Sequence, residues 1–170
     1  MNLLTEARSI LDGAGYRTHL PKSSSDRLIF EDDTLIGFIS VHSKVEEIVE
    51  KWQREQDAFL REHAPALRKE PNKAWNLYAV FLTSAPCPPA LKKEITNVEE
   101  DFRSTRKIVG FEIETHIDLV RAVITLLPIQ SQVVLQPQDL IARLRQIIEI
   151  PQLLEDQSLD EIFRMLTAPK

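Results

Sequence analysis

The stretch that decides the fold is Trp75-Asn76-Leu77-Tyr78-Ala79-Val80-Phe81-Leu82-Thr83. It is rich in apolar and aromatic side chains, which is typical of a buried strand. Prolines follow at positions 86, 88 and 89, and proline cannot donate a hydrogen bond inside a sheet. The sequence therefore predicts a core strand over 75–83, with Trp75 inside it, and a loop after it.

The segments after this loop have the spacing of a helix and then of a strand. Apolar residues recur at helical intervals from Leu91 to Phe102, and residues 107–113 favour a second strand. The acidic run 99–101 falls in the last turns of the predicted helix. Thr115 and Asp118 then have the spacing of a capping box. They predict a helix over about 116–127 that is apolar nearly all round and buried.

The segments before the core strand predict a helix, a hairpin and a long helix. Apolar residues between Leu3 and Leu11 share one helical face, and Gly13-Ala14-Gly15 ends that helix. Two β-rich runs, 27–31 and 35–41, are separated by a short polar turn and indicate a hairpin.

The long helix is predicted to begin at a capping box formed by Ser43 and Glu46 and to run to about Ala64, where Pro65 stops it. Its apolar stripe includes Trp52 and Phe59, which we expect in the core.

Beyond Pro128 the apolar pattern predicts two further helices, over about 140–148 and 159–166. We therefore expect an α/β core domain over 1–129 and a C-terminal helical appendage over 130–170, suited to docking. The expected fold class is α/β, with α+β as the alternative: a small central sheet, one long amphipathic helix and the C-terminal helices.

The overall composition narrows the classes of function. A net charge of -5 over 170 residues argues against general affinity for nucleic acid, because such binding neutralises phosphates with Lys and Arg. Cys87 is the only cysteine, which fits a reducing cytoplasm. The chain has neither the apolar run of a membrane span nor the start of a signal peptide. We expect a cytoplasmic protein with no membrane contact.

No complete set of catalytic residues is present. The four histidines lack metal-ligand spacing, and no phosphate-binding loop or nucleophile elbow occurs. A restriction-type nuclease would need an acid two residues before Lys44, where His42 stands. We therefore predict no enzyme activity, no cofactor and no metal. The alternative is a divergent or degenerate nuclease that uses Asp26, Glu31 or Asp33 with Lys44.

The densest charged cluster combines the acids 99–101 with Arg103, Arg106 and Lys107. The acids are close enough to neutralise the bases, so an internal ion-pair network is favoured over DNA contact. The second alternative is a DNA-binding regulator that uses these bases. Together with Trp75, which would act as an interface anchor if it were exposed, these three bases are the candidate interaction residues.

Three short sequence motifs resemble those of a known family. The motifs are Lys73-x-Trp75-Asn76-Leu77-Tyr78, Ile95-x-x-x-Glu99-Glu100-Asp101 and Arg106-Lys107-Ile108-Val109. They look like the small accessory subunits encoded beside SMC-like or other ABC ATPases in bacterial antiviral defence. These are the middle components of ABC three-component systems and the small subunit of Lamassu systems. The resemblance covers about residues 27–129.

The resemblance implies a non-enzymatic adaptor or regulatory subunit of an anti-phage or anti-plasmid complex. Its partners would be an SMC-like or ABC ATPase subunit and an effector subunit. DNA would be reached only through the complex.

Overall fold

A computed structural model describes residues 2–21 and 26–127. In chain order its elements are α1 (Leu3–Gly13), β1 (Arg17–His19), β2 (Arg27–Glu31), β3 (Ile36–Val41), α2 (Val45–Leu67), α3 (Pro71–Ala74), β4 (Leu77–Leu82), the 3₁₀ turn η1 (Pro89–Leu91), α4 (Lys92–Glu99), β5 (Arg106–Gly110), α5 (His116–Ala122) and the 3₁₀ turn η2 (Ile124–Leu126). The predicted C-terminal appendage, 130–170, lies outside the described residues.

The strands form one mixed sheet in the order β1-β2-β3-β4-β5. The first three strands are antiparallel, with Arg27 opposite Ser40 and Glu31 opposite Ile36 in the β2–β3 hairpin. β3, β4 and β5 are parallel to one another. Each parallel step crosses over through a helix, α2 and then α4, which is the usual connection between parallel neighbours. The fold is therefore α/β, as predicted.

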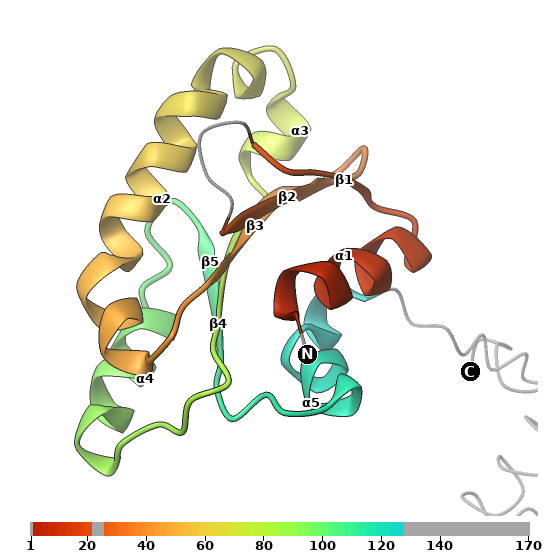
Figure 1. Cartoon of the computed structure of the whole chain (residues 1–170). Helices are drawn as coiled ribbons and strands as arrows, with labels where there is room; N and C mark the ends of the chain where they lie inside the picture. The colour runs from red at the N-terminus through yellow and green to blue at the C-terminus, as the bar shows by residue number, and fades with distance from the viewer. Residues whose placement is uncertain (1, 22–25, 128–170) are drawn as a thin grey trace, which may run out of the picture. The chain divides into compact units, whose positions relative to one another are not determined.

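Helices cover both faces of the sheet, with α2 and α4 on one side and α1 and α5 on the other (Figure 1). Alternate residues of each strand supply the two cores. Phe38 and Phe81 face α2 and pack around its Phe59, while Ile39 and Val80 face α1 and α5. The predicted core position of Phe59 is confirmed, and Trp52 is half-buried against the same core.

The hairpin, the first helix and the capping box at Thr115 and Asp118 are confirmed. The predicted limits of the long helix are wrong. The Ser43 hydroxyl donates to Glu47 at 2.6 Å, and no side chain caps the start of α2. The helix also continues through Pro65 to Leu67. The Arg68 N–H bonds to the Ala64 carbonyl, and Leu67 packs against the core beneath α2, which outweighs the donor that proline lacks.

The helix after Thr115 is shorter and more exposed than predicted. α5 ends at Ala122, and the chain then tightens into η2. Leu119 and Val123 are fully buried, whereas Ile117 and Ile124 are exposed. The helix therefore buries one face only.

No helix within residues 2–21 and 26–127 has both the length and the apolar character needed to cross a bilayer.

Candidate docking surface

The surface with the largest exposed aromatic side chains lies where β4 and β5 begin. Parallel neighbours start at the same edge of a sheet, so the segments that precede Leu77 and Arg106 meet there. They line an open hollow of about 660 Å³, formed by Ala74, Trp75, Leu77, Phe102, Ser104, Thr105 and Arg106. We call this set the docking surface.

Trp75 lies before β4 rather than inside it, which corrects the prediction. Pro71 starts the short helix α3, and Trp75 ends it in a helical backbone conformation. The strand therefore starts at Leu77, and 87% of Trp75 is exposed.

Lys73 anchors the short helix α3 to the sheet. Its buried ammonium lies 2.8 Å from the carboxylates of both Glu31 and Glu70. The hydrogen bonds that the ammonium donates to these two carboxylates raise the pKa of Lys73. Because Glu31 belongs to β2, this ion pair ties α3 to the sheet and so fixes where Trp75 emerges.

Phe102 also lies outside the element predicted for it. α4 ends at Glu99, whose carboxylate turns back and accepts a 3.0 Å hydrogen bond from the Val109 N–H of β5. The following loop, Glu100–Thr105, includes Ser104 in the left-handed region at φ 65°, which is uncommon for a residue with a side chain. The loop carries Phe102 outward, with 75% of it exposed.

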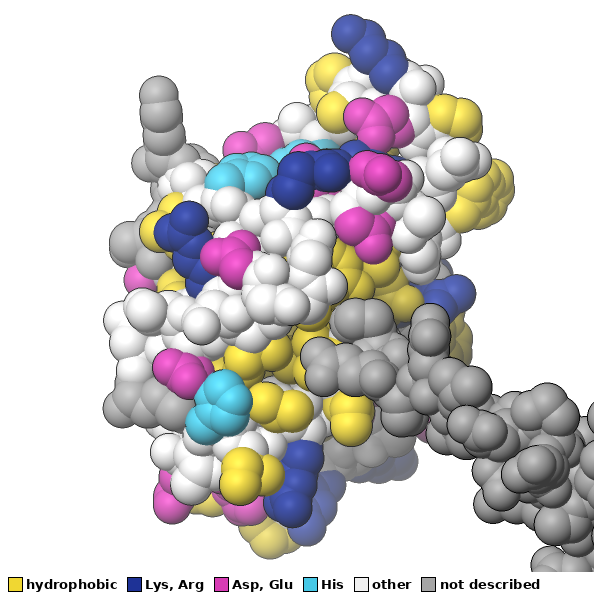
Figure 2. Space-filling model, turned by 90° about the vertical axis from the view of Figure 1, so that its right-hand side faces the viewer, with side chains coloured by type: hydrophobic (Ala, Val, Ile, Leu, Met, Phe, Trp, Pro, Cys, Tyr) yellow, Lys and Arg dark blue, Asp and Glu magenta, His cyan; other side chains and the backbone are white. Residues whose placement is uncertain are grey.

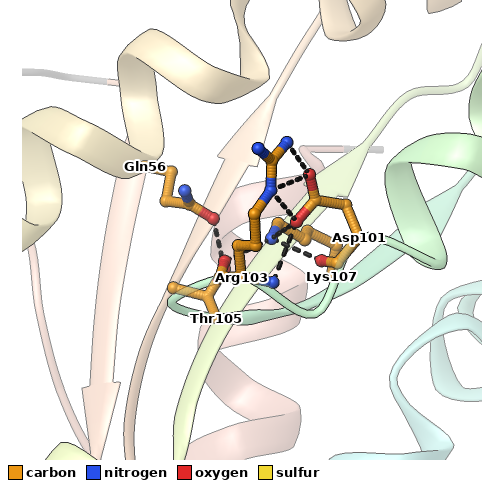
Figure 3. A network of polar contacts seen from close by, with 5 residues as sticks. All are labelled: Gln56, Asp101, Arg103, Thr105 and Lys107. Atoms are coloured by element: carbon orange, nitrogen blue, oxygen red, sulfur yellow. Dashed lines mark hydrogen bonds and ion pairs between the residues drawn. The ribbon is translucent and has the colours of Figure 1, made fainter.

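Part of the internal ion-pair network predicted for the charged cluster forms at this loop, between Asp101, Arg103 and Lys107 (Figure 3). Arg106 is not part of it and bonds to Tyr78. The Asp101 carboxylate accepts hydrogen bonds from the backbone N–H and the guanidinium of Arg103, and also contacts the ammonium of Lys107 at 3.2 Å. The Arg103 contact is the main reason that the pKa of Asp101 lies well below its ordinary range, although partial burial opposes this. Thr105 adds a buried 2.7 Å hydrogen bond to Gln56 of α2.

The four candidate interaction residues therefore differ in their environments. Trp75 and Arg106 line the hollow, and Arg106 donates to the Tyr78 hydroxyl at 3.2 Å. Arg103 is exposed but paired with Asp101, and the Lys107 side chain has no exposed surface. Lys107 is thus not a contact residue, which corrects its place among the candidates.

Sequence reasoning missed Phe102 as a surface residue. It continues the helical stripe of Leu91, Ile95 and Val98, and so was assigned to the helix. The acidic run just before it was the available signal, because acids at a helix C-terminus oppose the helix dipole and favour ending the helix earlier.

The structure separates two of the three acids of the nuclease alternative, Glu31 and Asp33, from Lys44. Lys44 follows β3, and Asp26 lies at the same end of the hairpin, where its carbonyl accepts from the Val41 N–H. Glu31 and Asp33 lie at the opposite end, roughly 16 Å away at the usual rise per strand residue. Within residues 2–21 and 26–127, no three His, Cys, Asp or Glu side chains are arranged to hold a metal ion.

A second polar cluster lies between β3 and α2. Both ring nitrogens of buried His42 face carboxylates, with Nδ1 3.8 Å from Glu47 and Nε2 3.5 Å from Glu55. Burial opposes ionisation of Glu55, but contacts with His42, Ser40 and Arg27 outweigh it and lower its pKa. The side chains of the cluster are packed under α2, which indicates a structural role in joining that helix to the sheet.

On the other side of the sheet, the face formed by α1 and α5 shows hydrophobic side chains between charged ones (Figure 2). Ile117 of α5 and Ile124 of η2 are the most exposed aliphatic side chains of the described residues. Both are aliphatic, whereas interface hot spots are enriched in Trp, Tyr and Arg. This face therefore has fewer of the side chains typical of a protein interface than the docking surface has.

Comparison with known proteins finds no matching family model, no matching curated protein and no matching solved structure.

Proposed function

We propose that this chain is a non-enzymatic adaptor subunit that binds another protein through the docking surface. The observation that carries the proposal is the exposure of Trp75 and Phe102 at one hollow, 87% and 75% respectively. Neither side chain contributes to the two cores. An aromatic side chain of this size gains about 1.5–3 kcal/mol when a partner removes it from water.

The neighbouring Arg106 strengthens this proposal. Interface hot spots are enriched in Trp, Tyr and Arg, and Arg106 lies with its guanidinium 5.7 Å from the Tyr78 ring. The stacked guanidinium is held in place on β5, so it is ready to meet an acidic or carbonyl group beside the aromatic contacts.

A more specific part of the proposal is the identity of the partner. The resemblance of the three motifs supports an SMC-like or other ABC ATPase together with an effector, in a cytoplasmic bacterial defence complex. In this role the adaptor holds the effector inactive until foreign DNA is sensed. Two of the motifs supply the docking surface itself, because Trp75 belongs to the first and Arg106 to the third.

Co-expression with the products of the adjacent genes tests the proposal. The tagged full chain should purify with an ATPase or an effector in a fixed ratio, and the association should survive nuclease treatment. A chain that purifies as a monomer without them contradicts the proposal. Retention of the isolated chain on DNA, weakening steeply with salt, would favour the DNA-binding regulator instead.

A further inference from the structure

The buried ammonium of Lys107 contacts the loop Glu100–Thr105 rather than its own strand, β5. Its hydrogen-bond acceptors are the Asp101 carbonyl, the Arg103 carbonyl at 2.7 Å and the Asp101 carboxylate at 3.2 Å. An ammonium has three donors, so these acceptors use all of them. The Trp52 ring of α2 lies 5.2 Å from the same nitrogen and closes the site from the helix side.

These contacts fix the loop from beneath. Asp101 and Arg103 flank Phe102 directly, and both present their carbonyls to the same nitrogen (Figure 3). Next in the chain, Ser104 has its left-handed backbone, and Thr105 is tied to Gln56. A left-handed serine persists only where its surroundings determine the conformation. The ammonium therefore sets the direction in which the Phe102 side chain projects from the loop.

We propose that Lys107 is a positioning residue for the docking surface: its buried ammonium holds residues 101–105 so that Phe102 lies at the same hollow as Trp75 before a partner arrives. The inference rests on the proposed docking function. A surface that is already ordered loses less conformational entropy on binding, so the same contacts give higher affinity.

Because Lys107 is buried, its effect on the loop can be tested separately from any direct contact with a partner. Its side chain has no exposed surface, so a partner cannot touch it without rearranging the loop. Burial also lowers the pKa of Lys107, opposed by the Asp101 hydrogen bond, and the Asp101 carboxylate balances its charge. A substitution here changes the order of the loop without removing any exposed side chain.

The test compares Lys107→Met with Lys93→Met in the full chain. Methionine keeps an unbranched side chain that is one atom shorter, and it removes the donors. We expect amide hydrogen exchange of residues 102–105 to become at least about tenfold faster, with residues 79–81 of β4 unchanged. Affinity for the ATPase or effector that co-purifies should fall about tenfold. Lys93→Met makes the same change at an exposed position of α4 and should change affinity less than about threefold.

A measurement on the wild-type chain keeps the proposal testable if Lys107→Met does not fold. Backbone order parameters of residues 102–105 should be near 0.85, the usual value for a rigid backbone. Values below about 0.6 in the free protein would overturn the inference, as would unchanged loop exchange in Lys107→Met.

Different results would contradict the docking function and the positioning role of Lys107. If Trp75→Ala and Phe102→Ala both keep full affinity, the docking function is wrong. If they lose affinity while Lys107→Met keeps it, only the positioning role is wrong.

Discussion

At the residue scale, two aromatic side chains that the sequence places in the core have opposite environments. Phe59 has no exposed surface and packs on the Phe38 ring at 5.0 Å, whereas Trp75 projects from the end of α3. Phe59→Ala should therefore lower the free energy of unfolding by about 3–5 kcal/mol. Trp75→Ala should change it by less than about 0.5 kcal/mol. Denaturant unfolding of both variants measures this, and a loss above about 2 kcal/mol for Trp75→Ala would place that side chain in the core.

A second prediction at this scale concerns Glu47. Hydrogen bonds from Ser43 and then Lys51 lower its pKa from 4.5 to about 2. Because the pKa is lowered in the folded state, its stabilising contribution is complete above about pH 4.5 and is lost as the pH falls through about 2. NMR titration of the Glu47 carboxyl carbon should show this low midpoint. Ser43→Ala should raise it, and a midpoint near 4.5 in the wild type would contradict the structure.

Residue positions were predicted least well where a distant partner decides them. The aromatic run from Trp75 onward gave no sign of where the strand starts, because that depends on Lys73 pairing with Glu31, 42 positions earlier. Lys107 and Arg103 likewise look equivalent in the sequence. Strand alternation turns Lys107 inward beneath the loop. The two carbonyls that receive its ammonium are close in sequence, but only the folded shape of the loop brings them to that nitrogen.

At the element scale, Gly110 allows α5 to approach the end of β5. A Cβ there would lie 2.9 Å from Cβ of Ala122 and 2.9 Å from Cδ2 of Leu82, so Gly110→Ala should cost about 1–3 kcal/mol through overpacking. Gly13, the last residue of α1, has nothing within 4 Å of such a Cβ. Gly13→Ala should stabilise the protein by about 0.5–1 kcal/mol, because alanine favours the helix. Thermal unfolding of the pair checks this, and equal effects would contradict the packing described for α5.

Elements were predicted well where local signals are strong. The hairpin has two apolar runs around a polar turn, and Thr115 and Asp118 form the capping box that their spacing predicts. β1 was missed because its three residues, Arg17–His19, have no apolar alternation. It forms by pairing along β2, which is information from outside the segment. The helix-ending effect of Pro65 was overestimated for a similar reason, since the packing of α2 on the sheet outweighs one lost hydrogen bond.

At the scale of the whole molecule, the α/β class followed from the order of predicted helices and strands, whereas the site did not follow from any one of them. The docking surface exists because β4 and β5 are parallel neighbours, which brings the end of α3 and the α4–β5 loop to one edge. The sequence supplied Trp75 and Arg106 as candidates, but the strand order was needed to place them with Phe102.

The measurement that tests the docking function most directly is the affinity of Trp75→Ala for the ATPase or effector that co-purifies with the wild-type chain. A hot-spot side chain contributes about 2 kcal/mol or more on truncation, so the dissociation constant should rise at least about 30-fold, with unfolding unchanged. Ile117→Ala is the matched control, because Ile117 is also exposed, at 61%, but lies on α5. It should change affinity less than about threefold. Equal affinity of the Trp75→Ala variant and the wild type would contradict the account.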